Sequence, residues 1–378
     1  MTSKTIDNIV WFIPFKKLRD SVRDYLLFQY NIRNDIYGFL QSNNNLKDIV
    51  KEQHLSLSSL KEDIKEFISL NKPKQAVDIG LISRFREHIK NDNNFLSKYT
   101  NLITNLDDDS IKIINNIIAK ICNYNNIEDE IYFTHDELKE LNKFEAEYYN
   151  KIIKINEELF IYYKYVLPFN QFEIEVFYDK CGIDYIKNIN NIKNKSIIDA
   201  GGFIGDSAIV FSNYTDKNVY SFEPFLRNYN MILKTIELNK KNNIIPVNIA
   251  LGDENKDISI YSRGNIDSGL SVENKKEINS VENKVKMVTL DSYVKENNIE
   301  VGLIKTDLEG FEQPFLKGAI NTIKEQKPVL IISIYHNYSD FFEIKPMIEN
   351  LNLGYKFRII KNKCPKIIGE TKLLAEVC

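Results

Sequence analysis

The stretch that decides the fold is Ser196-Ile-Ile-Asp-Ala-Gly-Gly-Phe-Ile-Gly-Asp206. An apolar run ends at Asp199, three glycines follow within six residues, and a helix-compatible segment begins at Asp206. Glycine lets the backbone turn sharply and come close to a ligand. A strand, a glycine loop and a helix in this order form the cofactor site of doubly wound α/β folds, so the stretch predicts an enzyme.

Composition excludes several classes of protein. The 378 residues are enough for two domains, and 43% of them are apolar, which is sufficient for a core. A net charge of −3 lacks the basic surplus of a nucleic-acid binder, so we expect no nucleic-acid partner. The four cysteines form no CxxC pair and the four histidines no HExxH motif, which disfavours a disulfide framework, a zinc cluster and a zinc hydrolase.

The expected location is the cytoplasm. Widely spaced free cysteines fit a reducing compartment, and no apolar run reaches the roughly 18–20 residues that cross a bilayer, so we expect no transmembrane segment. The apolar segment Ile9–Phe15 is followed by Lys16, Lys17 and Arg19, which leaves peripheral contact with the inner membrane as an alternative.

Glycine and proline divide the chain into two halves. Of 14 glycines, only Gly38 and Gly80 precede position 181, and a region rich in Leu, Ile, Lys and Glu with few breakers predicts helices. Apolar residues recur there at helical spacing: Leu57, Leu60, Ile64, Phe67 and Ile68, then Ile111, Ile114, Ile117, Ile118 and Ile121. Asn71-Lys-Pro-Lys74 predicts a break. We therefore expect a coiled-coil-like helical region over 1–72 and a helical domain over 73–168.

The capping-box pattern Thr134-His-Asp-Glu137 predicts that a long helix runs from about Asp136 to Tyr165. Strands and helices alternate afterwards, which predicts a mostly parallel, three-layer sheet over 169–378. The expected strands lie near 196–200, 218–222, 244–250, 257–261, 301–306, 328–334, 355–360 and 372–377, and the expected helices near 207–212, 225–240, 289–297, 311–320 and 341–351. The short connection between the last two strands predicts an antiparallel pair.

Two features predict which cofactor the glycine loop holds. Glu223 ends the second strand, 24 residues beyond Asp199, close to the roughly 20 expected of an acid that binds ribose hydroxyls; the alternative is a solvated loop acid. Gly201, Gly202 and Gly205 give GGxxG rather than the GxGxxG of dinucleotide sites. This spacing favours a cofactor without phosphates, such as S-adenosylmethionine.

A second polar group follows the strand 301–306. Lys305, Asp307 and Glu309 alternate, so an extended backbone points them the same way. They indicate a polar pocket, the alternative being an ion pair of Lys305 with Asp307 or Glu309 that braces the sheet. His336 ends the next strand, and its ordinary pKa suits a general base. Two carboxylates would also suit a hard cation, but we expect a site without a metal.

Together these segments resemble the FkbM family of S-adenosylmethionine-dependent methyltransferases. The resemblance covers about residues 170–378 and implies the class I methyltransferase fold, whose last strands are antiparallel. It rests on six segments in order: Ile197–Asp206, Ser221–Pro224, Ala250–Gly252, Thr289–Tyr293, Lys305–Glu312 and Leu316–Gly318.

The resemblance also implies roles. Asp199, Gly201 and Gly205, with Gly202, would line the methionine end of the cofactor, Glu223 would hold its ribose, and the segment from Asn248 through Ala250 to Leu251 would lie near adenine. The four residues facing the acceptor would be catalytic: His336 or Asp307 as base, with Lys305 and Glu309 orienting the acceptor.

The family implies O-methylation, often of a sugar or polyketide hydroxyl. The segment Trp11–Arg19 is similar to segments attached to bacterial surface-glycan enzymes, which favours a free or nucleotide-linked sugar of capsule or lipopolysaccharide biosynthesis as acceptor. Alternatives are a methyltransferase of another small molecule and a non-catalytic assembly protein with a relic fold. The helical region would form a homodimer or cover the acceptor, or pack on the enzyme domain.

Overall fold

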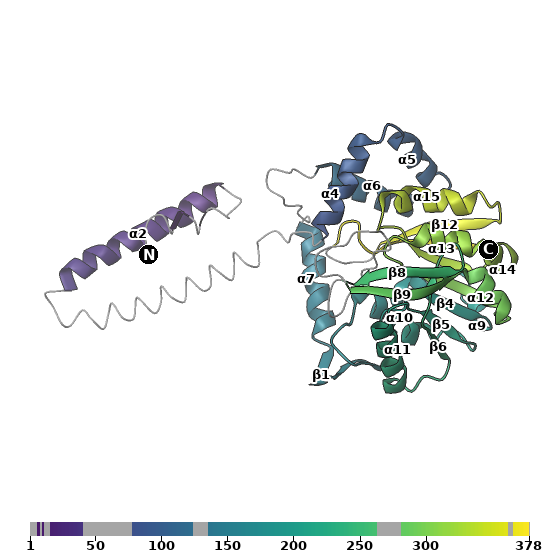
Figure 1. The fold of residues 1–378 in the computed structure, drawn as a ribbon. Helices are drawn as coiled ribbons and strands as arrows, with labels where there is room; N and C mark the ends of the chain where they lie inside the picture. The colour runs from purple at the N-terminus through teal and green to yellow at the C-terminus, as the bar shows by residue number, and fades with distance from the viewer. Residues whose placement is uncertain are drawn as a thin grey trace. The chain divides into compact units, whose positions relative to one another are not determined.

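The computed structural model describes residues 6–7, 10, 16–40, 78–123, 135–262, 281–361 and 366–377. The chain divides into two compact units, Met1–Lys74 and Gln75–Cys378 (Figure 1). Helix α2 (Lys16–Leu40) makes up most of the described part of the first unit, where Ile6, Val10 and Leu26 form a small core. The predicted stripe at Leu57–Ile68, the break at Asn71–Lys74 and the capping box at Thr134 lie outside the described residues.

The second unit contains a seven-stranded sheet in the order β12-β13-β11-β10-β4-β5-β6. β13 runs antiparallel to both β11 and β12, and the pairs from β11 to β6 are parallel. This confirms the predicted fold class and the antiparallel pair at the end. The strands are β4 (Ser196–Ala200), β5 (Val219–Phe222), β6 (Ile244–Val247), β10 (Val301–Thr306), β11 (Val329–Ser333), β12 (Tyr355–Lys361) and β13 (Thr371–Val377).

Helices cover both faces of the sheet, because its strands are apolar on both sides. One face packs against α8 (Ile174–Phe177), the 3₁₀ helix η1 (Lys180–Tyr185), α9 (Asn190–Lys193), α10 (Asp206–Phe211) and α11 (Leu226–Leu238). The other packs against α12 (Leu290–Glu296), α13 (Glu312–Gly318), α14 (Ile320–Gln326) and α15 (Tyr338–Glu349). The result is the predicted three-layer arrangement.

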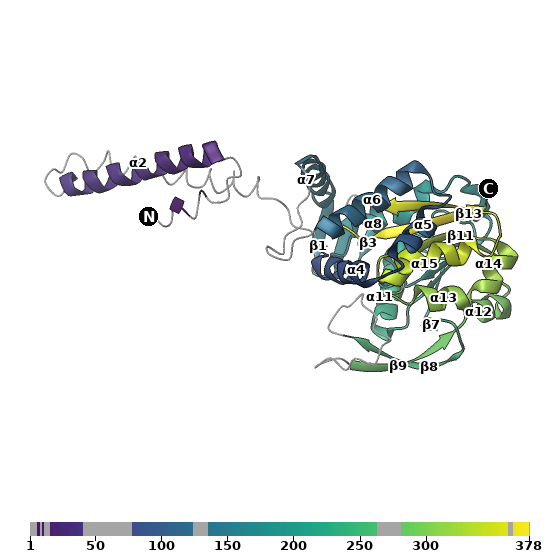
Figure 2. The same cartoon turned by 90° about the horizontal axis from the view of Figure 1, so that it is seen from above.

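Three earlier helices belong to this second layer rather than to a separate domain over 73–168. They are α4 (Ile79–Asn91), α5 (Phe95–Ile103) and α6 (Asp108–Asn123), and α5 lies beside α15 in both views (Figures 1 and 2). Ile82, Phe85 and Ile114 are buried in the same core as the sheet. The Ser110 hydroxyl also accepts a hydrogen bond from the Ile359 backbone N–H at 2.8 Å. Of the three predicted roles, packing on the enzyme domain is therefore confirmed for residues 79–123.

The predicted helix to Tyr165 is wrong beyond Tyr149. Helix α7 (His135–Tyr149) ends there, and a three-stranded antiparallel sheet follows with β1 (Ile152–Asn156), β2 (Leu159–Tyr162) and β3 (Tyr165–Leu167). Tertiary packing overrides the helical propensity here. Side chains along β2 alternate, so that Phe160 and Tyr162 are buried in the second core, which is the apolar cluster on the sheet face covered by α8 to α11, while Ile161 faces the other way.

A further small sheet, β7-β9-β8, lies beside the glycine loop at Gly201. It is formed by β7 (Ala250–Leu251), β8 (Lys256–Ser262) and β9 (Val281–Val288), and the β8–β9 ribbon lies apart from the main sheet (Figure 2). The sequence predicted a strand at β8, whereas β9 was not predicted. Among the described residues, no helix combines the length and apolarity needed to cross a membrane.

Candidate functional site

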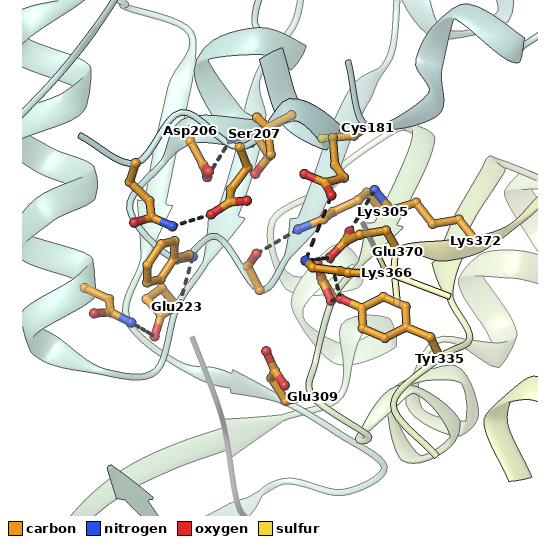
Figure 3. A pocket seen from close by; sticks show the side chains of 18 of the residues that line it. Cys181, Asp206, Ser207, Glu223, Lys305, Glu309, Tyr335, Lys366, Glu370 and Lys372 are labelled. Atoms are coloured by element: carbon orange, nitrogen blue, oxygen red, sulfur yellow. Dashed lines mark hydrogen bonds and ion pairs between the residues drawn. The ribbon is translucent and has the colours of Figure 1, made fainter. Parts of the chain in front are cut away.

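The carboxyl ends of β4, β5, β10 and β11 meet at a polar cavity of about 170 Å³ (Figure 3). Segments far apart in the sequence line it, from the stretch before η1 to the beginning of β13. The lining residues used below are Glu175, Cys181, Gly201, Phe203, Asp206, Ser207, Glu223, Phe225, Asn228, Lys305, Asp307, Glu309, Tyr335, Lys366, Glu370 and Lys372. This is the edge of the sheet at which α/β folds bind ligands.

The glycine loop is shaped by close backbone contacts. Gly201 has φ +86°, and a Cβ atom there would lie 2.0 Å from the Asp307 carbonyl oxygen. A Cβ at Gly202 would lie 2.1 Å from the Ser221 hydroxyl oxygen. No other residue type fits these two positions without displacing the end of β10 or β5. Gly201 lines the cavity, whereas Gly202 and the α10 N-cap Gly205 shape the loop behind it.

A buried ion pair supports this loop from below. Asp199 is fully buried, and its Oδ2 accepts hydrogen bonds from the Ser207 and Ser221 hydroxyls at 2.8 and 3.0 Å. Lys305 Nζ lies 3.2 Å from Asp199 Oδ1 and donates to the Gly201 carbonyl at 2.8 Å. Burial opposes ionisation of Lys305, but Asp199 and Asp307 outweigh it and raise the pKa of the lysine.

Asp199 thus orients the loop rather than lining the cavity. Lys305 forms an ion pair with Asp199, whereas the alternative considered from the sequence paired it with Asp307 or Glu309. The ammonium group of Lys305 is used by Asp199 and the Gly201 carbonyl, so Lys305 supports the glycine loop. Its predicted role in orienting the acceptor stays a prediction.

Glu223 lies at the cavity wall, in the place expected of a ribose-binding acid. Its Oε2 accepts from the Phe203 N–H at 3.0 Å and its Oε1 from the Phe225 N–H at 2.9 Å. Burial raises the pKa of Glu223 to about 8, against the effect of these N–H groups. The carboxyl group is therefore held in one orientation beside the glycine loop. Its burial argues against the alternative of a solvated loop acid, and its predicted role in ribose binding stays a prediction.

The two residues expected near adenine have different environments. Ala250 lines a small apolar cavity of about 20 Å³ together with Gly201, Pro224 and Ile260. Asn248 lines neither cavity; its side-chain N–H group donates to the carbonyls of Glu223 and Pro224 at 2.9 and 3.0 Å. Asn248 therefore fixes the Glu223 loop, and its predicted place near adenine stays a prediction.

His336 is surrounded by acids. Its Nδ1 lies 2.9 Å from Glu312 Oε1, and its Nε2 lies 3.3 Å from Asp307 Oδ1 and 3.6 Å from Glu309 Oε2. Burial opposes protonation, but Glu312, Asp307 and Glu309 outweigh it and raise the pKa of His336 to about 10. The imidazole therefore carries two protons at neutral pH.

A protonated imidazole has no lone pair for a hydroxyl proton, so the geometry argues against His336 as the base. His336 is also not among the residues that line the cavity. The charge of His336 also acts on Asp307. Burial alone would raise the pKa of Asp307, but His336 together with Lys305 holds that pKa below its usual range.

Glu309 has the opposite environment from Asp307. Burial raises the pKa of Glu309 to about 7, with His336 opposing and Asp307 reinforcing the shift. Its backbone φ is +53°, a region that residues other than glycine adopt at a cost of about 1–3 kcal/mol and that is common at functional sites. Its carboxylate points into the open part of the cavity (Figure 3). A carboxylate that titrates near neutral pH is suited to proton transfer.

Asp307, Glu312 and His336 each place a ligand atom within 4.8 Å of the others, close enough for a metal ion. Glu312 already accepts hydrogen bonds from the N–H groups of Leu308 and Gly310, at 2.8 and 2.9 Å. This carboxylate therefore caps the loop after β10, and the expectation of a metal-free site stays a prediction.

The wall opposite the glycine loop was not predicted from the sequence. Tyr335 donates to Asp307 at 3.2 Å and to Glu370 at 3.4 Å. Lys366 Nζ lies 2.9 Å from Glu370 and 3.9 Å from Glu175. The one local signal was the pair Glu370 and Lys372 at the start of the buried strand β13, since charges entering a buried strand require a partner or a ligand.

Comparison with known proteins identifies the domain. Residues 199–357 match the family model described as the methyltransferase FkbM domain. Among solved structures, methyltransferase FkbM from Methylobacillus flagellatus KT matches with 17% identity and a TM-score of 0.50, over 78% of this chain and 60% of that one. No curated protein matches this chain.

Two further structures match less well. Trm5b from Pyrococcus abyssi has 13% identity and a TM-score of 0.33, over 59% of this chain and 56% of that one. TYW2 from M. jannaschii, in complex with AdoMet, has 16% identity and a TM-score of 0.30, over 60% and 87%. The domain match and the sheet order agree with the resemblance seen in the sequence. Residues 199–357 of the chain carry a methyltransferase FkbM domain.

Proposed function

We propose that this protein transfers the methyl group of S-adenosylmethionine to a hydroxyl of a sugar. One observation carries the proposal: a single continuous cavity brings together the Gly201 loop, the Glu223 carboxylate and the carboxylates that follow β10. The family match of residues 199–357 supports the reaction class.

The residues present fit this cofactor. Gly201 brings its bare backbone to the cavity wall, and the loop has no wider glycine pattern for a pyrophosphate. Glu223 is fixed by backbone N–H groups in a position to accept from ribose hydroxyls. The apolar cavity at Ala250 and Ile260 offers a surface for adenine. The cofactor supplies an activated methyl group on a sulfonium ion.

The chain supplies alignment and a base. Asp199 and Lys305 hold the glycine loop in place, so that loop and acceptor keep a fixed separation. We assign the base to Glu309 rather than to His336: the acceptor hydroxyl loses its proton to this carboxylate while its oxygen takes the methyl group. Such a base contributes about 10²–10⁴-fold to the rate. Asp307, ionised and bonded to Tyr335, helps to fix the acceptor.

The sugar acceptor is supported by the wall opposite the glycine loop. Hydrogen-bond donors and acceptors lie side by side there, which suits a ligand with several hydroxyl groups. The donors are Tyr335 and Lys366, and the acceptors are Glu370 and Glu175. The biosynthesis of capsule or lipopolysaccharide in the cytoplasm remains part of this proposal, supported by the similarity of Trp11–Arg19 to surface-glycan enzymes.

Two assays test the proposal. Transfer of labelled methyl from S-adenosylmethionine to isolated surface glycans of a strain lacking the gene should require the protein and fall strongly in Glu309→Gln. The glycans of that strain should lack the mass of one methylene group per modified residue. Lys356→Met, on the exposed side of β12, is the matched control and should retain full transfer. Full transfer by Glu309→Gln would contradict the assigned base, and unchanged glycan mass would contradict the sugar acceptor.

A further inference from the structure

Three lysines line the cavity, and they differ in how well they are paired. Lys305 Nζ has Asp199 at 3.2 Å and the Gly201 carbonyl at 2.8 Å. Lys366 Nζ has Glu370 at 2.9 Å. Lys372 is 3% exposed, yet its closest carboxylate among the described residues is Glu370 at 3.9 Å, beyond hydrogen-bond distance. Figure 3 shows its amine end turned toward the cavity.

A buried ammonium group without a hydrogen-bonded anion is unfavourable, because burial removes its hydration. A ligand that brings a carboxylate within about 3 Å of Lys372 would restore the missing interaction. Lys372 is therefore matched to an anionic group that enters the cavity, whereas Lys305 and Lys366 are already satisfied.

Sheet register places Lys372 on the same face as the glycine-loop support. Lys305 pairs with Asp199 on one side and with Ile331 on the other, and Ile331 pairs with Leu374. Lys372 lies two residues from Leu374 on β13, so its side chain leaves the same face of the sheet. The buried Cys181 lines the cavity on this face.

Strand order then decides which part of the cofactor meets Lys372. The order is β13-β11-β10-β4-β5, with the glycine loop after β4 and Glu223 after β5. With the ribose at Glu223, the amino-acid end of the cofactor lies on the other side of the glycine loop, toward β10, β11 and β13. Its carboxylate is an anion that can approach Lys372 to hydrogen-bond distance, which the nearest carboxylate of the described residues, Glu370 at 3.9 Å, does not.

We infer that Lys372 binds the carboxylate of the methionine end of the cofactor. This inference rests on the proposed function and adds a binding residue from the last strand, outside the glycine loop and the segment after β10. The competing source of a carboxylate is an acidic group on the acceptor, and the test separates the two.

The experiment is isothermal titration of the full chain with two probes. One is S-adenosylhomocysteine; the other is its decarboxylated analogue, which keeps the adenosine, the thioether and the ammonium group. A charge-assisted hydrogen bond in a buried site predicts that the wild-type protein prefers S-adenosylhomocysteine by about tenfold to a hundredfold. Lys372→Met should lose this preference while its affinity for the analogue stays the same. Lys356→Met should behave as the wild type.

Several outcomes would overturn the inference. The inference is wrong if the wild-type protein binds both probes equally well, or if Lys372→Met loses affinity for both probes in parallel. It is also wrong if Lys372→Met keeps the wild-type preference, and in that case the acceptor remains as the source of the carboxylate. Should Lys372→Met fail to fold, Lys372→Gln and the wild-type ratio carry the same test. If the wild-type protein binds neither probe, the proposed function itself is wrong. If it binds both probes but Lys372→Met does not change the preference, only the role of Lys372 is wrong.

Discussion

Replacing Lys305 by methionine tests the role of the buried ion pair beneath the glycine loop. The side chain of Asp199 is fully buried and that of Lys305 is 6% exposed, so the variant leaves an unpaired carboxylate in the core. Breaking a buried pair by removing one partner costs about 3–5 kcal/mol. The lost hydrogen bond from Lys305 Nζ to the Gly201 carbonyl is included in this range, because it belongs to the same ammonium group.

The assay is chemical denaturation of the full chain, monitored with a probe that reports on the second unit. The dependence of the unfolding free energy on denaturant concentration is compared between variants. Lys305→Met should lower the free energy of unfolding by about 3–5 kcal/mol. The double variant Asp199→Asn with Lys305→Met should recover part of that loss, since the unpaired charge is gone. Lys356→Met should remain within about 0.5 kcal/mol of the wild type. A loss below about 1 kcal/mol in Lys305→Met would refute the assigned pairing.

Three other variants test separate parts of the account. In Glu309→Gln, kcat/KM should fall about 10²–10⁴-fold. The wild-type rate should rise with pH and level off above about pH 7, because the raised pKa of Glu309 leaves its carboxyl group protonated below that pH. A flat wild-type pH profile would contradict this role of Glu309. Gly201→Ala should abolish S-adenosylhomocysteine binding in a titration, because the new Cβ would lie 2.0 Å from the Asp307 carbonyl; near wild-type affinity would contradict the loop geometry. Ser110→Ala should lower the free energy of unfolding by about 1–3 kcal/mol, since the Ile359 N–H is buried and loses its acceptor, and an unchanged value would argue that α6 does not belong to the enzyme core.

Much of the fold follows from the order of short apolar runs. Asp199 and Glu223 could be placed at strand ends because β4 and β5 are short, mainly apolar segments followed within two residues by glycine or proline. The hairpin at β1 and β2 was missed because Lys, Glu and Asn between its apolar residues fit a helix as well as a strand. Only packing against the second core separates the two.

The ionisation states of the site required the tertiary structure. The residue types Lys305, Asp307 and His336 were visible in the sequence, but their partners were not, because sheet pairing and a loop cap select them. The register of β4 and β10 places Lys305 beside Asp199, and the loop before α13 places Glu312 beside His336. The second contact turns the predicted base into a cation.

The central claim is that the cavity binds S-adenosylmethionine at the Gly201 loop and Glu223. The most direct measurement is isothermal titration of the full chain with S-adenosylhomocysteine, with NAD as the comparison ligand. S-adenosylhomocysteine should bind saturably and one to one, and about 10-fold or more weakly in Glu223→Ala because the ribose hydroxyls lose their hydrogen-bond acceptor, whereas NAD should not bind. Absence of S-adenosylhomocysteine binding by the wild-type protein, or saturable binding of NAD, would contradict it.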